Sequence, residues 1–290
     1  MSDLFDGTIE PSKCVAFLLS LRAPEEAEKY LVGKCKAFPT GLQYMSERWQ
    51  SYPTLIAANI KPITEIDIND SNFVKSLGEK LSFDISRFID FIEGYALVAE
   101  DIKPVMLHYS VIYLLDFFSR TWLNYGQNNR HGLSMIPCQM DQTVLDTKVK
   151  ISENGVFQRS TDAFFVVGQS SLFSKNEEHG IGYLFCADGT TYPEKFTKLS
   201  YASRPQITLR ELFGIYNRLN DTQGVLISAG NKILAGYLIL FLVSSISRYR
   251  ARDWFEVCSD RNLINRVALL CHDFISKWIP ELLLQQTVRP

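Results

Sequence analysis

An almost wholly apolar run from Ile233 to Ile246 constrains the fold of this chain more than any other feature. A helix that crosses a bilayer needs about 18 to 20 apolar residues, and this run is shorter and contains two serines near its end. The run therefore predicts a helix buried in a protein core, and no membrane association is expected.

The composition is that of a globular protein with a sizeable core. The chain has 290 residues, of which 46% are hydrophobic and 21% are charged, and its net charge is −2. Because acidic and basic residues nearly balance, no field of the whole molecule attracts nucleic acid or an anionic membrane, and any such binding must be local. The six cysteines show no paired spacing and no secretion signal is recognisable, so a cytoplasmic location is expected.

Other segments carry the three- and four-residue spacing of apolar side chains that is typical of amphipathic helices. We expect these helices at 14–19, from Pro24, over 82–100, from Pro104 to about 118, from Thr208, and over 260–278. Thr208 and Glu211 have the spacing of a capping box, and Asn231 is the expected cap of the apolar helix. Recurring prolines between 39 and 70 predict extended or turn structure.

The spacing changes in the middle of the chain. β-Branched and polar residues alternate from Val144 to Ser152, and Asn154-Gly155 is a favoured two-residue hairpin turn before a return strand at 156–158. Further strands are expected at 163–167 and 183–186. We therefore expect an N-terminal helical region at 1–143, a small antiparallel β insertion at 144–200 and a C-terminal helical region at 201–290, which together form one compact, mainly α domain of the α+β type.

The helix over 260–278 carries the first candidate site. On an ideal helix, Arg261, Asn265 and His272 fall on one polar face opposite the apolar side chains. Arginine binds phosphate oxygens in a bidentate manner and histidine titrates near neutrality, so this face can be an RNA-binding surface or a solvated helix face.

The spacing from Arg266 to His272 resembles the motif of HEPN-fold ribonucleases. Proteins of that family are helical, cut RNA without a metal ion and usually bring two such motifs together across a dimer. The resemblance implies that His272 and Arg266 are catalytic residues on HEPN-like helices. On an ideal helix the two residues project about 120° apart.

A cluster of arginines and aromatic residues follows the apolar run. Arginines in such a cluster can hold a phosphate backbone while the rings stack on bases. They can equally bind the carbonyl end of the preceding helix and pair with nearby acids. The cluster comprises Arg248, Tyr249, Arg250, Arg252 and Trp254.

The remaining candidates are histidines. His131 follows Arg130 in an expected turn, where both can belong to a binding site or the histidine can bond a backbone group. His108 lies in an apolar helix and is expected to be an interior residue, and His179 is expected to be solvated. The motifs of zinc, P-loop and serine-hydrolase sites are missing, so no metal and no cofactor is expected.

The order of several short motifs resembles the YaaC-like family of bacterial proteins over roughly residues 45 to 280. That resemblance implies a cytoplasmic, mainly helical protein and brings no catalytic residue with it. The motifs are His108-Tyr109, His131-Gly132-Leu133, Asn154-Gly155-Val156-Phe157, Thr208-Leu209-Arg210-Glu211-Leu212 and Arg248-Tyr249.

Two functions remain open. The first is a non-enzymatic interaction or regulatory component that binds a protein partner or a second copy of itself, which includes a component of a bacterial toxin or antiphage defence system. The alternative is a metal-independent ribonuclease or RNA-binding toxin that uses Arg266 and His272.

Overall fold

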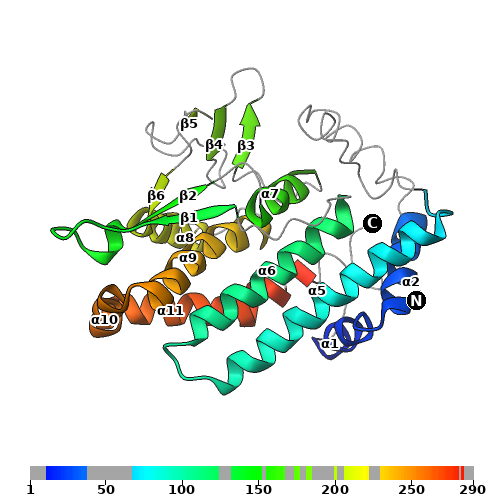
Figure 1. Ribbon diagram of the computed structural model, residues 1–290, viewed down its shortest axis with the longest axis horizontal. Helices are drawn as coiled ribbons and strands as arrows, with labels where there is room; N and C mark the ends of the chain where they lie inside the picture. The colour runs from blue at the N-terminus through cyan, green and yellow to red at the C-terminus, as the bar shows by residue number, and fades with distance from the viewer. Residues whose placement is uncertain are drawn as a thin grey trace.

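The computed structural model describes residues 11–37, 67–123, 132–151, 155–166, 173–176, 181–184, 199–200, 206–221, 229–280 and 282–283. Over these residues the protein is mainly helical and carries two small antiparallel sheets, which confirms the expected α+β class. Figure 1 shows the strands on the opposite side of the molecule from the two N-terminal helices, which lie within residues 11–37.

A long helical hairpin forms one half of the core. Helix α5 (Ser71–Leu97) begins earlier than the expected residue 82, because the Asp70 carboxylate caps it by accepting the backbone N–H of Phe73 at 3.0 Å. Helix α6 (Lys103–Trp122) follows and lies along α5. Helices α1 (Pro11–Ser20) and α2 (Pro24–Ala37) confirm the two expected N-terminal helices, and α2 packs on α5 (Figure 1).

Helix α9 (Ala229–Tyr249) is the centre of the other half. Every residue from Ile233 to Ile246 is buried, which confirms the predicted core helix. Its 18-residue window from Lys232 to Tyr249 is apolar enough to cross a membrane, but 78% of that window is buried inside the fold. The expected cap at Asn231 is wrong, because the helix already begins at Ala229.

The sheet nearest the core differs from the expected hairpin. Strand β2 (Lys148–Ile151) pairs antiparallel with β1 (Leu133–Ile136) on one side and with β6 (Gln206–Thr208) on the other. In this register Leu133 lies opposite Ile151 and Val149 lies opposite Ile207. The strand predicted from Val144 is therefore correct only in its second half, since Val144–Asp146 forms a 3-10 helix.

The expected return strand at 156–158 is wrong, and so is the strand expected from residue 163. Both segments lie in helix α7 (Val156–Val166), which packs on α6 and α9. Phe157, Ser160 and Phe164 are buried at helical spacing. Burial of this one helix face therefore outweighs the preference of the β-branched residues for a strand. Gly155 has a φ of 155° just before the helix, and Asn154 and Val167 lie outside the described residues.

A second sheet joins β3 (Phe173–Asn176), β4 (Ile181–Leu184) and β5 (Leu199–Ser200) in that order. The strand expected at 183–186 is confirmed for its first two residues and lies outside the described residues for the rest. The region expected as a β insertion, 144–200, thus contains a helix, and the first sheet takes strands from both sides of it.

The helices expected from Thr208 and over 260–278 are present, and a further helix over 251–259 was not expected. The capping box of α8 (Leu209–Asp221) is confirmed, because the Thr208 N–H donates to Glu211 at 3.0 Å and the Glu211 N–H donates to the Thr208 hydroxyl at 3.1 Å. Helix α10 (Ala251–Ser259) leads into α11 (Arg261–Asp273), which is capped by Asp260 and continues as a π-helix (Phe274–Trp278).

Two helical glycines give a matched test of the packing around α9. A Cβ added at Gly236 would lie 2.6 Å from Cζ of the buried Phe274, whereas a Cβ added at Gly214 in α8 meets nothing within 4 Å. Gly236→Ala should lower the free energy of unfolding by about 1–3 kcal/mol through overpacking. Gly214→Ala should raise it by about 0.5–1 kcal/mol through helix propensity. Urea denaturation of the two variants measures both effects, and equal effects would contradict the close approach of Phe274 to α9.

Candidate functional site

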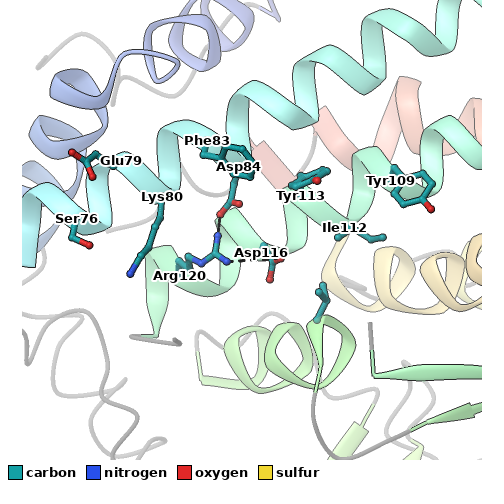
Figure 2. Close-up of a pocket in the computed structure, with 11 residues that line it drawn as sticks. Ser76, Glu79, Lys80, Phe83, Asp84, Tyr109, Ile112, Tyr113, Asp116 and Arg120 are labelled. Carbon is teal, nitrogen blue, oxygen red and sulfur yellow. Dashed lines mark hydrogen bonds and ion pairs between the residues drawn. The ribbon is translucent and has the colours of Figure 1, made fainter. Parts of the chain in front are cut away.

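A pocket lies between α5, α6 and the first residue of α7 (Figure 2). Its cavity measures about 530 Å³, within the usual range for small-molecule sites. Charged, hydroxyl and aromatic side chains dominate its lining. The lining residues are Ser76, Glu79, Lys80, Phe83 and Asp84 from α5, Tyr109, Ile112, Tyr113, Asp116 and Arg120 from α6, and Val156.

Helical spacing places these residues together. The lining residues of α5 recur at three- and four-residue steps from Ser76 to Asp84, and those of α6 do so from Tyr109 to Asp116. Each set therefore lies on one face of its helix, and the two faces meet because α5 packs along α6. In Figure 2, Ser76, Glu79 and Lys80 lie toward one end, Tyr109 lies at the other, and Asp84, Arg120 and Asp116 lie between Lys80 and Tyr109.

A chain of buried ion pairs forms the middle of the pocket. The Arg120 guanidinium of α6 donates a hydrogen bond to the Asp84 carboxylate of α5. Arg159 of α7 donates to Asp116 Oδ1 at 2.7 Å. Arg120 Nη2 lies 4.0 Å from Asp116 Oδ2, so this contact is an ion pair without a hydrogen bond. The four charges thereby connect three helices.

Burial changes the proton affinity of two members of this chain. It raises the pKa of Asp116 above its ordinary value, and the nearby charge of Arg159 opposes that rise. Burial and then the charge of Arg159 lower the pKa of Arg120 to about 10. Asp116 is thus a desolvated carboxylate with a charge partner in a pocket, a combination that is typical of functional sites.

Aromatic rings line the pocket on the side of Tyr109 and Tyr113 and continue to Phe91 of α5. The centroid of Tyr113 lies 6.0 Å from that of Phe83 and 5.8 Å from that of Phe91, and Phe91 stacks on Tyr109 at 5.4 Å. Arg248, at the end of α9, donates to the Tyr109 hydroxyl at 2.6 Å. A continuous series of contacts therefore joins the pocket to the arginine cluster that the sequence singles out.

Among the described lining residues, Lys80 is the cation without an ion-pair partner. Arg120 is engaged with Asp84, whereas no carboxylate within the described residues pairs with Lys80. Lys80 is half-buried and its neighbours Ser76 and Glu79 are exposed, so the amine lies at an opening that a ligand can enter.

The two residues of the HEPN-like motif have different surroundings. The Arg266 guanidinium lies over the Phe213 ring of α8, 4.3 Å from its centroid. His272 is exposed on the face that also exposes Arg261 and Asn265, so the polar face expected on α11 is present. Within the described residues no hydrogen bond or ring contact joins Arg266 to His272, and the neighbouring Cys271 is buried.

Much of the arginine cluster has structural partners. The Arg248 Nε donates to the Ser244 carbonyl at 3.1 Å at the end of α9, and Arg250 pairs with Asp253 at 3.0 Å. The Arg248 guanidinium also lies 4.9 Å from the ring centroid of the exposed Tyr249. Arg252 is exposed, and Trp254 is half-buried against the core.

The histidine candidates are placed only in part. His108 is fully buried and stacks on Tyr237 at 5.4 Å, which confirms the expected interior position. Arg130, His131 and His179 lie outside the described residues. Within the described ranges no group of three or more histidine, cysteine, aspartate or glutamate residues could hold a metal ion.

The ion-pair chain was not predicted from the sequence, although one feature of α6 indicated that buried charges were present. Helix α6 is apolar on most sides, so Asp116 and Arg120 had to lie among buried residues, and they are four residues apart. Charged residues at such positions need partners from other elements. Those partners, Asp84 and Arg159, are distant in sequence and cannot be identified from local spacing.

No protein-family model matches the chain, and no curated protein and no solved structure is significantly similar to it. The resemblances to YaaC-like and HEPN proteins therefore stay predictions.

Removal of Arg159 should test the buried chain. Arg159→Met leaves Asp116 Oδ1 without its ion-pair partner and should cost about 3–5 kcal/mol at neutral pH. The exposed pair Arg22–Asp90, 2.8 Å apart, provides a control, and Arg22→Met should cost less than about 1 kcal/mol.

The loss of folding stability caused by Arg159→Met should also depend on pH. Loss of Arg159 removes the charge that opposes the rise in the pKa of Asp116, so the folded variant keeps a proton at pH values where the unfolded chain has lost it. Its stability relative to the wild type should therefore fall as pH rises from mildly acidic to neutral. Urea titrations at both pH values measure this slope, and a pH-independent deficit would show that Asp116 is not the group left unpaired.

Proposed function

We propose that this protein is a non-enzymatic regulatory component whose partner interactions respond to a small polar ligand bound between α5, α6 and α7. The single observation that supports this function most is the pocket itself, a cavity of about 530 Å³ lined by charged side chains of α5 and α6, with the lining residue Asp116 paired to Arg159 of α7. A cavity with a few convergent polar groups and a perturbed carboxylate is the usual form of a small-molecule site.

The position of the pocket supports a regulatory role. Asp84 and Arg120 connect α5 to α6, and Asp116 and Arg159 connect α6 to α7. A ligand that binds these groups changes the free energy of the contact between α7 and the hairpin. Such a ligand shifts the populations of conformations that differ in this contact, which is how binding in one place alters a surface elsewhere.

The protein partner or second copy of the chain expected from the sequence stays a proposal. Several large apolar side chains are exposed near the turn between α5 and α6 and on α9, α10 and α11, where a partner could bury them. They are Leu97, Ile102, Tyr249, Phe255 and Leu269.

A ligand screen tests the proposed function. Thermal unfolding is measured with a panel of polar metabolites for the wild type, for Tyr113→Ala in the pocket, and for Lys75→Gln as an exposed control on α5 outside the lining. A bound ligand at about 100 times its Kd adds about 2.7 kcal/mol of stability, which raises Tm by several degrees. We expect at least one metabolite to stabilise the wild type and the control but not Tyr113→Ala. Recovery of a chemically altered metabolite, or stabilisation of no variant by any metabolite, would contradict the proposal.

The ribonuclease alternative is favoured by one specific observation, the exposure of His272 beside Arg261 and Asn265 on α11. An exposed imidazole on a polar face can reach RNA, and the arginines can bind its phosphates.

An RNA-cleavage assay separates the two functions. We expect single-stranded RNA to remain intact when it is incubated with the protein in the presence of a chelator, and His272→Ala to behave as the wild type does. Gel analysis of labelled RNA reads the result. Cleavage that His272→Ala abolishes, while an exposed control such as Asn262→Ala retains it, would establish the ribonuclease instead.

A further inference from the structure

The polar groups of the pocket are arranged in a definite order. The rings of Tyr109 and Tyr113 lie at one end, the Asp116 carboxylate lies in the middle, and the Lys80 amine lies toward the other end, with Ser76 and Glu79 beyond it (Figure 2). Ile112 and Val156 add apolar surface to the lining. A ligand that fits this order has an apolar or aromatic part, a hydrogen-bond donor, and an anionic group.

The acceptor in the middle is Asp116 Oδ2. Arg159 donates to the other oxygen of this carboxylate at 2.7 Å, while the one contact of Oδ2 with a charged group of the described residues is that with Arg120 at 4.0 Å. A hydrogen-bond donor with a positive charge would complete the coordination of Oδ2 and offset the burial of Asp116. Nearby aromatic faces also attract cations. An ammonium group satisfies both the carboxylate and the rings.

The anionic group belongs at Lys80. The amine has no carboxylate partner among the described residues, and it points to the same side of the two helices as the Asp116 carboxylate (Figure 2). Arg120, whose guanidinium lies between them, can donate a further hydrogen bond, since one guanidinium carries five N–H groups.

The charges of the pocket select the net charge of its ligand. Among the described residues, the lining carboxylates of Glu79, Asp84 and Asp116 are balanced by Lys80 and Arg120 of the lining together with Arg159, which pairs with Asp116 but does not itself line the pocket. A partly buried site with balanced charge disfavours a ligand that brings a large net charge, because the excess would be desolvated without a partner. A nucleotide with two negative charges on its phosphate is therefore disfavoured, and a zwitterion is favoured.

We propose that the ligand of this pocket is a zwitterionic α-amino acid with an aromatic side chain. Its ammonium group donates to Asp116 Oδ2, its carboxylate binds Lys80, and its ring packs against Tyr113 and Tyr109. This inference rests on the proposed function, because it names the class of ligand for the same site.

Isothermal titration calorimetry on the full chain tests the assignment from the ligand side. The probes are L-phenylalanine, L-tyrosine and L-tryptophan. Phenethylamine lacks the carboxylate, 3-phenylpropionate lacks the ammonium group, and glycine lacks the ring. Adenosine 5′-monophosphate represents a competing class of ligand. At least one of the three amino acids should bind, and loss of either charged group from it should weaken binding about tenfold or more, since hydrogen bonds to charged groups contribute about 1.5–3 kcal/mol.

Variants test it from the protein side. Lys80→Gln should weaken phenylalanine binding about tenfold and leave phenethylamine binding unchanged, because only the former has a carboxylate for Lys80 to bind. Tyr113→Leu should weaken both, and the exposed control Lys75→Gln should weaken neither. Circular dichroism and Tm establish that each variant is folded. Asp116 is left intact in these experiments because it also pairs with Arg159.

Two results would overturn the assignment: tighter binding of adenosine 5′-monophosphate than of all three amino acids, or equal weakening of phenylalanine and phenethylamine by Lys80→Gln. If another metabolite of the ligand screen stabilises the protein through Tyr113 while no aromatic amino acid binds, the amino-acid assignment fails and the proposed function stands. If no metabolite stabilises the protein, both fail.

Discussion

The fold and its candidate site both depend on the buried ion pairs of Asp84, Arg120, Asp116 and Arg159. Burial of one unpaired charge in a protein core is so unfavourable that each of these residues requires its partners. Arg120 cannot stay inside the hairpin of α5 and α6 without Asp84, and Asp116 cannot stay charged beneath α7 without Arg159. Buried pairs of this kind often add little net stability compared with apolar residues, which makes a role in specificity or ligand binding the better explanation for their presence.

The parts of the fold that follow from local chemistry could be predicted from the sequence. The apolar run that became α9, the capping box of Thr208 and Glu211, and the helical spacing along α5, α6 and α11 each depend on residues within a few positions of one another. The hairpin expected around Gly155 does not form, because Phe157 and Phe164 lie at helical spacing on a face that packs on α6 and α9, and this burial outweighs the local turn signal.

The site required information that local patterns do not contain. Asp84 and Arg120 are separated by 36 residues, and Asp116 and Arg159 by 43, so only the packing of three helices brings them together. The C-terminal arginines, in contrast, are recognisable as a candidate site from the sequence alone, because they are clustered along the chain. Arg248 nevertheless reaches Tyr109 of the pocket lining at 2.6 Å, so the two regions adjoin through one side chain.

A crystal structure of the full chain with the tightest-binding aromatic amino acid would test the central claim most directly. That claim is that the cavity over the ion-pair chain is the functional site of the molecule. We expect electron density for the amino acid between α5, α6 and α7, with its ammonium nitrogen within hydrogen-bond distance of Asp116 Oδ2 and its carboxylate within hydrogen-bond distance of Lys80 Nζ. Density for the amino acid at another surface, with solvent alone in the cavity, would contradict it.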